Sequence, residues 1–308
     1  MVTQDRPVVC VSYLASAELW SVSKFPTANQ GAEIRTTEHS IAGDAPMAAA
    51  VLAALEVPTL LVSNRIGNDD VGGRVGGWLQ QRAVPMATVA SADVSTPRIV
   101  VVADDEHTRT WFAHLPGVAE ELSKTNLSHI AKASLVYLDA YRLIEEAAVR
   151  VVQIARQHCI QLFINLGGEP LSRELRIALA GYRDLVIQTN VDDRTHRTAS
   201  TVAREILDMT CADWVIVTAG AYGSVAVSRG QYLTTSAFRV DIRHTHCAGA
   251  AFSGGLLYGL YLGLPMARSM LLGSASGALR CARPQNAPLP TLLEIEAVIA
   301  TLSRSSAN

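Results

Sequence analysis

The segment Val240–Gly255 has the clearest potential for chemistry, because a turn of small residues precedes a long apolar run. We expect the turn at Cys247–Ala250 to open a helix. The first N–H groups of a helix have no partner within it, and the helix dipole favours negative charge there. This predicts an anion-binding turn suited to phosphate. The same small residues would also let the helix pack closely against a sheet, and spacing alone leaves both interpretations open.

Two further segments have residue types typical of phosphate or metal contacts. Thr218–Gly223 carries two glycines, which permit tight turns and close backbone approach to phosphate oxygens. A plain turn between two strands would use the same residues. Asn190–Asp193 supplies oxygen donors of the kind that Mg²⁺ binds. A solvated loop between a strand and a helix fits that composition as well.

Short apolar runs alternate with longer helical patterns through most of the chain, and these elements must position the candidate residues. Such alternation predicts right-handed βαβ crossovers and a mostly parallel sheet between two layers of helices. The strands show no polar alternation, as expected for strands covered on both faces. The predicted strands are Val8–Val11, Thr59–Ser63, Leu135–Leu138, Leu162–Asn165, Leu185–Gln188, Trp214–Thr218 and Ser224–Ser228. The predicted helices include Ala45–Leu55, Gly72–Arg82, Glu145–His158, Leu171–Ala180, Thr198–Met209, Gly249–Leu262 and Pro290–Ser303.

Residues 20–43 and 94–115 break this alternation with extended, half-polar segments. We predict that they pair as a small antiparallel sheet outside the main one and serve as a lid. The chain has no Pro/Ser-rich linker and no internal repeat. It is therefore predicted to form a single domain over residues 1–308, an α/β/α sandwich with a small β-sheet lid.

Composition excludes several classes of protein. With 49% hydrophobic and 18% charged residues, the chain fits a well-packed globular domain rather than a disordered one. The net charge of −2 and the absence of a basic run argue against nucleic-acid and membrane partners. Five scattered cysteines predict a reducing, cytoplasmic setting without disulfides or a zinc site. The start of the chain does not read as a signal peptide. The uncharged stretch from His246 to Arg268 is long enough for a bilayer, but its many small residues favour a buried helix.

Several of these motifs, taken in order, resemble those of the ribokinase-like (PfkB) carbohydrate kinases. His244–Gly255 is similar to the family segment Asp-Thr-Thr-Gly-Ala-Gly-Asp-x-Phe-x-x-Gly, and Thr218–Gly223 to the family turn Thr-x-Gly-x-x-Gly. Asn190–Asp193 resembles Asn-x-x-Glu, although Asp193 is shorter than Glu. Ala42–Ala49 falls at the family's Gly-Gly-x-x-x-Asn-x-Ala, and Ile66–Gly72 at a structural Gly-x-Asp-x-x-Gly. The resemblance runs from about residue 8 to residue 283.

The resemblance implies binding of ATP and Mg²⁺. The metal and phosphate region would lie near Asn190 and Asp193. The implied nucleotide contacts are Thr218, Gly220, Gly223, Cys247, Ala248, Gly249 and Asn190. The implied substrate contacts are Ala17, Gly43, Asp44, Met47 and Asn165.

Departures from the family pattern are concentrated on the side of the acceptor substrate. The family's general base, an aspartate, is Ala250 here, and the first aspartate of the same motif is His244. Ala17 and Met47 replace a substrate-binding Asp and Asn. The fourth-strand signature Asp-x-Asn-x-Arg keeps only Asn165. His244 or His246 could substitute as base, since imidazole titrates near neutral pH; a capping or packing role is the alternative.

Two functional hypotheses follow. In the first, the protein is a kinase that moves the γ-phosphate of ATP to a hydroxyl of a sugar or nucleoside-like compound, with activity impaired at Ala250. In the second, it is a pseudokinase that keeps the fold and acts as a ligand-binding or regulatory protein. By analogy with the family, a homodimer through the lid is expected.

Overall fold

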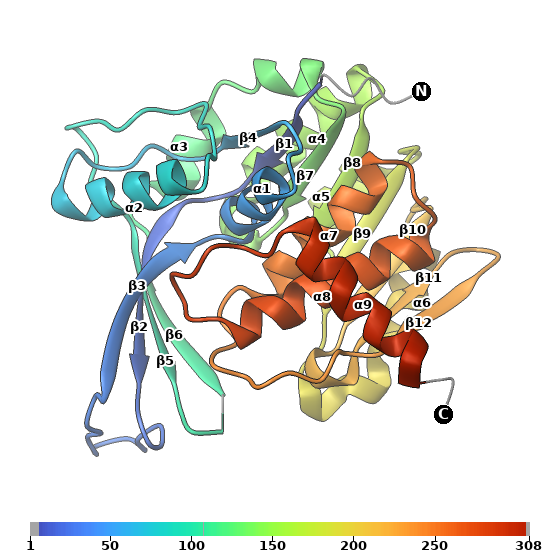
Figure 1. The fold of residues 1–308 in the computed structure, drawn as a ribbon. Helices are drawn as coiled ribbons and strands as arrows, with labels where there is room; N and C mark the ends of the chain where they lie inside the picture. Colours follow the sequence, from blue (N-terminus) through green and yellow to red (C-terminus); the bar gives the residue numbers. More distant parts are fainter. Residues whose placement is uncertain (1–5, 107, 306–308) are drawn as a thin grey trace.

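The computed structural model describes residues 6–106 and 108–305. Its larger sheet has the strand order β12-β11-β10-β9-β8-β7-β1-β4 (Figure 1). Within it, β10, β9, β8, β7, β1 and β4 run parallel to one another. β11 and β12 continue it as antiparallel strands. The strands are β1 (Val8–Val11), β4 (Thr59–Val62), β7 (Leu135–Asp139), β8 (Gln161–Asn165), β9 (Leu185–Asn190), β10 (Trp214–Thr218), β11 (Ser224–Val227) and β12 (Tyr232–Thr235).

Helices cover both faces of this sheet, and a separate hydrophobic core fills each interface. One core joins the sheet to the helices that lie in front in Figure 1, and the other joins it to those behind. The helices of the first core are α1 (Asp44–Ala54), α2 (Asp70–Gln81), α7 (Ala248–Tyr261), α8 (Met266–Ala282) and α9 (Leu292–Ser305). Those of the second are α4 (Glu145–Gln157), α5 (Arg173–Leu179) and α6 (Ala199–Met209). The predicted three-layer fold is confirmed, and no described helix is long and apolar enough to cross a membrane.

A smaller sheet projects to one side of the molecule (Figure 1, lower left). Its order is β3-β2-β5-β6, with antiparallel outer pairs and a parallel β2–β5 pair at the centre. Its strands are β2 (Ala15–Ser21), β3 (Thr36–Ala42), β5 (Arg98–Ala103) and β6 (Arg109–His114). Together they match the two segments expected to form the lid, although β2 begins earlier than the predicted residue 20. A short helix, α3 (Val118–Lys124), follows β6.

The small residues of α7 have two different roles. A side chain on Gly254 would collide with Val51 of α1, and one on Gly255 would collide with Leu272 of α8. These glycines therefore let α7 pack closely against both neighbours. Gly249, in the first turn of α7, has open space around it instead. Close packing thus explains the glycines in the middle of α7. It does not explain the small residues Cys247–Ala250 at the N-terminal end of the helix, which we call the entrance of α7.

Candidate functional site

Polar side chains end several of the parallel strands at one edge of the larger sheet. Asp139 ends β7 and Asn165 ends β8, and the two are register partners. Asn190 ends β9 and pairs in the same way with Thr218 at the end of β10. The carboxyl ends of parallel strands meet at one edge, which is where open α/β sheets bind ligands.

Asp139 is the buried centre of this edge, with a side chain that is 0% exposed. Its Oδ2 accepts the backbone N–H groups of Asp44 (3.0 Å) and Ala45 (2.8 Å), which open α1. Its Oδ1 accepts the O–H of Tyr137 at 2.9 Å. The carboxylate therefore lies at the positive end of α1, where the helix dipole stabilises it.

Asn165 and Tyr141 tie a second carboxylate, that of Asp44, to the first. Asn165 Nδ2 donates to Asp139 Oδ1 (2.9 Å) and to Asp44 Oδ2 (2.9 Å), and Tyr141 O–H donates to Asp44 Oδ2 (2.7 Å). We call Asp44, Asp139, Tyr141 and Asn165 the carboxylate cluster. Because Asp44 is only partly buried, the cluster presents acceptors to a ligand at its open side.

The charge of Asp44 acts on the buried carboxylate of Asp139. Burial first, and then repulsion by Asp44, raises the pKa of Asp139 to about 7, against the opposing effect of its hydrogen bonds. Burial and the same two negative charges raise the pKa of Tyr141 well above its ordinary value. Asp139 is therefore partly protonated near neutral pH.

Two glycines allow tyrosine side chains to close around the cluster. Gly43 has φ of +98°, and a side chain there would collide with the carbonyl oxygen of Tyr13. Gly167 has φ of +60°, and a side chain there would collide with the ring of Tyr141. The rings of Tyr13 and Tyr141 lie 6.0 Å apart. Both positions thus require glycine for conformation and for space.

The entrance of α7 lies near this cluster. Cys247 is the N-cap residue of the helix and has a left-handed conformation (φ 58°). Burial raises the pKa of its thiol to about 12, and the negative charges of Asp44 and Asp139 add to that effect. Ala250, which the resemblance aligns with the family's base, is 1% exposed and packs in the core. The N–H of Ala248 donates to the carbonyl oxygen of Thr245 at 3.3 Å. The N–H groups of Cys247, Gly249 and Ala250 have no backbone acceptor among the described residues, so they remain available to an anion.

His244 and His246 are poorly suited to replace the missing base. Burial lowers the pKa of His244 to about 4 and that of His246 to about 3, and the positive charge of Arg280 adds to both effects. His246 Nε2 lies 3.0 Å from the carbonyl oxygen of Ile41, so the neutral ring donates its proton there. A group that protonates only at such low pH is a weak proton acceptor at pH 7.

We expect the free energy of unfolding to decrease as the pH falls below about 6.5, because unfolded imidazoles protonate there and folded His244 and His246 do not. Each histidine contributes a slope of at most about 1.4 kcal/mol per pH unit. Asp139 acts in the opposite direction, since its raised pKa makes stability fall as the pH rises from about 4 to 7.

Urea unfolding of the wild type and of His246→Gln between pH 4.5 and 7.5 measures how much His246 contributes to the pH dependence of the free energy of unfolding. Glutamine keeps a donor for Ile41 but cannot titrate. The variant should show a smaller loss of stability on acidification. Parallel curves of unfolding free energy against pH for the two proteins would contradict the lowered pKa of His246.

The predicted nucleotide side is formed by two adjacent loops. The N–H of Val191 donates to the carbonyl oxygen of Thr218 at 2.9 Å, which joins the loop after β9 to the one after β10. Gly220 (φ 50°) faces the carboxylate of Asp193, and Gly223 (φ 85°) packs against β12 too closely for any side chain. Asn190 and Asp193 are exposed here and offer the oxygen donors that Mg²⁺ prefers, so the residues fit that ion. In the described part of the chain, no group of three or more His, Cys, Asp or Glu side chains could hold a metal ion.

Two predicted substrate contacts are buried among apolar residues. Ala17 belongs to a small core beside the smaller sheet, and Met47 is 0% exposed inside the core that contains α1. The structure does bring together Gly43, Asp44 and Asn165. Sequence reasoning missed Asp139 and Tyr141, although one signal was visible: Asp139 directly follows the apolar run Leu135–Leu138 at the carboxyl end of a parallel strand.

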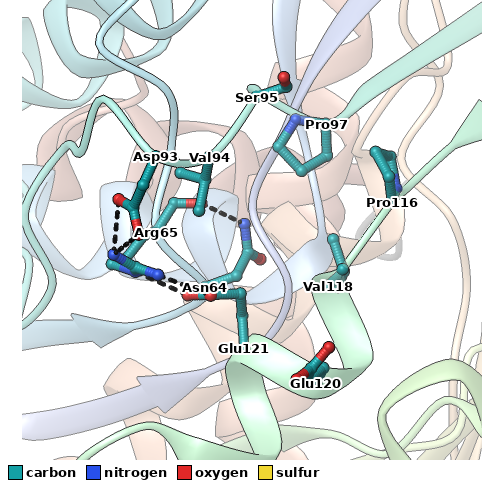
Figure 2. A pocket seen from close by; sticks show the side chains of 11 residues that line it. Asn64, Arg65, Asp93, Val94, Ser95, Pro97, Pro116, Val118, Glu120 and Glu121 are labelled. Atoms are coloured by element: carbon teal, nitrogen blue, oxygen red, sulfur yellow. Dashed lines mark hydrogen bonds and ion pairs between the residues drawn. The ribbon is translucent and has the colours of Figure 1, made fainter.

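A separate cavity of about 250 Å³ lies where the smaller sheet joins the larger one, between the segments that lead into β5 and out of β6 (Figure 2). Its one basic side chain, Arg65, is held by Glu121 at 2.7 Å and by Asp93 at 2.9 Å. Asn64 is bonded to both backbone groups of Leu14. These polar groups are already satisfied by one another, so the cavity offers a ligand less than the sheet edge does.

Known proteins resemble this chain over most of its length. The model of the family described as pfkB family carbohydrate kinase matches residues 6–292. A Bacillus licheniformis protein named 5-dehydro-2-deoxygluconokinase is 26% identical over 198 residues, which make up 59% of this chain and 61% of that protein. The chain thus spans about three fifths of the length of the curated relatives that it matches.

Two solved structures share the fold. The ribokinase of Arabidopsis thaliana, solved with ribose and ATP, superimposes with a TM-score of 0.75 at 17% identity, over 96% of this chain and 98% of its own. A nucleoside kinase of Methanocaldococcus jannaschii gives a TM-score of 0.76 at 18% identity, over 97% and 99%.

Proposed function

Because the chain belongs to the pfkB family of carbohydrate kinases, we propose that it binds ATP and a sugar-like compound and transfers the γ-phosphoryl group to a hydroxyl at a reduced rate. The observation that carries this proposal is the carboxylate cluster beside the entrance of α7. It places hydroxyl-binding acceptors next to a turn suited to phosphate.

The acceptor side is supported by the chemistry of the cluster. The part of Asp44 that is not buried can accept a hydrogen bond from a sugar hydroxyl, and Asn165 and Tyr141 fix its orientation. An acceptor held in a fixed orientation keeps a substrate in one pose and reduces the entropic part of the barrier. The names of the relatives, a deoxygluconokinase and a ribokinase, agree with a compound rich in hydroxyl groups.

The phosphate side is supported by the free entrance of α7 and by the loop Thr218–Gly223. The turn Cys247-Ala248-Gly249 would place the free N–H groups of Cys247 and Gly249 around the transferred phosphoryl group. Thr218, Gly220 and Gly223 would line the nucleotide. Asn190 and Asp193 would hold Mg²⁺ through its water shell, and that ion would neutralise charge on the β- and γ-phosphates.

Ala250 is the reason for the reduced rate. When the acceptor oxygen attacks phosphorus, the bond to the leaving phosphate oxygen breaks and the hydroxyl proton must be removed. Ala250 has no group to accept that proton, and His244 and His246 are weak acceptors at neutral pH. Losing a positioned general base typically lowers the rate by about 10²- to 10⁴-fold. Positioning and electrostatic stabilisation would supply the remaining catalysis.

The second candidate is a pseudokinase that binds ligands without turnover. The same replacement at Ala250, with Met47 buried in the core, favours it. The exposed Trp111 and Phe112 on the edge strand β6 agree with a dimer through the smaller sheet, which stays a prediction.

We expect calorimetric titration to show binding of ATP in the presence of Mg²⁺, with a matching rise in the unfolding temperature. Saturation at a hundredfold excess over Kd raises stability by about 2.7 kcal/mol. The variant Gly249→Asp should weaken ATP binding by about tenfold or more, because it adds negative charge at the entrance of α7.

The matched control is Gly73→Asp in α2, because both glycines are helical, exposed and surrounded by open space. That control should leave ATP affinity unchanged. A coupled assay of ADP release across a panel of sugars, sugar acids and nucleosides then tests transfer. Binding of ATP without turnover of any acceptor would favour the pseudokinase. No binding at millimolar ATP would remove the kinase and leave a pseudokinase whose ligand or partner is not a nucleotide.

A further inference from the structure

Arg280, near the end of α8, is a buried guanidinium that forms no ion pair with a carboxylate among the described residues, although the charge of Glu38 acts on it from a distance. The residue is 2% exposed, and its Nη1 donates to the carbonyl oxygen of Gln285 at 2.8 Å. Its Nε and Nη2 have no acceptor among the described residues. Arg65 shows the ordinary alternative, since its guanidinium is held by two carboxylates.

Burying an unpaired charge costs several kcal/mol, so such a group needs compensation from elsewhere. Burial lowers the pKa of Arg280, but a guanidinium stays protonated in proteins at neutral pH. Hydrophobic residues of similar size would stabilise this position better. The cost of keeping arginine here therefore points to a role in binding rather than in folding.

The end of α8 that carries Arg280 packs against the turn that leads into α7. One turn earlier on α8, Gly277 packs against the carbonyl oxygen of Ala248. One residue later, the carbonyl oxygen of Cys281 accepts the N–H groups of Arg243 and His244. The positive charge of Arg280 counteracts the effect of burial on the pKa of the Cys247 thiol, and it lowers the pKa of His244.

A second guanidinium reaches the same turn from the smaller sheet. Arg109 of β6 donates to the carbonyl oxygen of Thr245 at 2.8 Å. Two arginines and the positive end of α7 thus converge on one turn, where they repel one another unless an anion lies between them.

We propose that Arg280 is the electrostatic partner of the α7 entrance: it strengthens the binding of an oxyanion, the phosphoryl group of the nucleotide, at the N–H groups of Cys247, Gly249 and Ala250. Arg280 acts through the potential at that turn, as a positioning residue that need not touch the anion. The inference rests on the proposed function, because it assigns the phosphoryl group to this turn.

The test compares Arg280→Met, which keeps the length and removes the charge, with Arg280→Lys, which keeps the charge. Inorganic phosphate and ATP with Mg²⁺ are titrated separately by calorimetry, and thermal unfolding is recorded without ligand. Arg280→Met should unfold at a higher temperature than the wild type, because it removes an uncompensated buried charge. It should also bind phosphate about tenfold or more weakly. Arg280→Lys should recover most of that affinity.

Opposite changes in stability and affinity are the signature of the proposed role. A merely structural arginine would give lower stability in Arg280→Met with phosphate affinity equal to that of the wild type, and this result would overturn the inference. Failure of Arg280→Lys to recover affinity, or a wild type that binds neither phosphate nor ATP, would overturn it too.

The proposed function fails separately from this inference. If phosphate binding depends on Arg280 but no acceptor is phosphorylated, the inference stands and the transfer reaction does not. If the wild type phosphorylates a sugar and Arg280→Met binds phosphate and ATP as tightly as the wild type does, the transfer reaction stands and the inference on Arg280 does not.

Discussion

Replacing Ala250 with aspartate should raise the rate of phosphoryl transfer by about 10²-fold or more. Ala250 lies in the first turn of α7, where backbone N–H groups can hold the phosphoryl group and where the family carries its base. Asp44 and Asp139 already raise the pKa of Cys247, three residues earlier. Their charges would keep a new carboxyl group from becoming too weak a base, against the opposing effect of the helix dipole.

The rate is measured as kcat for the best acceptor found in the panel. Ala250→Asn is the matched control, since it adds the same volume at a position that is 1% exposed but cannot accept a proton. An equal rate in both variants would mean that proton removal does not limit the reaction. A folded Ala250→Asp variant that binds ATP and phosphorylates nothing would make the pseudokinase the better description.

Removing the carboxylate of Asp139 should have the largest effect on stability. Asp139→Ala leaves the first N–H groups of α1, the O–H of Tyr137 and one donor of Asn165 without their buried acceptor. Loss of a buried acceptor of this kind costs about 3 kcal/mol or more. Urea unfolding measures the loss, and Asp193→Ala, at an exposed carboxylate, should change stability by less than about 0.5 kcal/mol.

Asp44→Asn tests the same cluster without dismantling it. Asparagine keeps an oxygen for Tyr141 and Asn165 but removes the charge that helps raise the pKa of Asp139. This variant should raise the KM for the acceptor while leaving ATP affinity unchanged. Wild-type KM in Asp44→Asn, together with wild-type stability in Asp139→Ala, would show that the cluster neither binds the acceptor nor supports the fold.

The acceptor site also contains polar groups that the family motifs did not point to. Ala17 and Met47 stand where the family has polar contacts, and this pattern indicated a site that had lost most of its hydrogen-bonding groups. The structure buries both residues and builds a different polar cluster around Asp139 and Tyr141. Motif matching overlooked it because it compares positions one by one, whereas a carboxylate on a neighbouring strand can supply acceptors to the same space.

The sequence by itself determined the elements and their order. Apolar runs such as Leu135–Leu138 predicted strands covered on both faces, and alternation with helices predicted a mostly parallel sheet between two layers of helices. Small residues at Cys247–Ala250 predicted the start of α7. These features depend on local patterns, because side-chain size and polarity over a few residues decide strand, helix and turn.

Only the tertiary structure decided which polar groups meet. Asp139 and Asp44 are 95 residues apart in the chain, and their contact depends on where α1 begins relative to the end of β7. The lowered pKa of His246 follows from burial, and the isolation of Arg280 follows from the packing of α8 beside the entrance of α7. Burial, charge and hydrogen bonding act over a few ångströms between segments distant in sequence, so residue type alone did not reveal them.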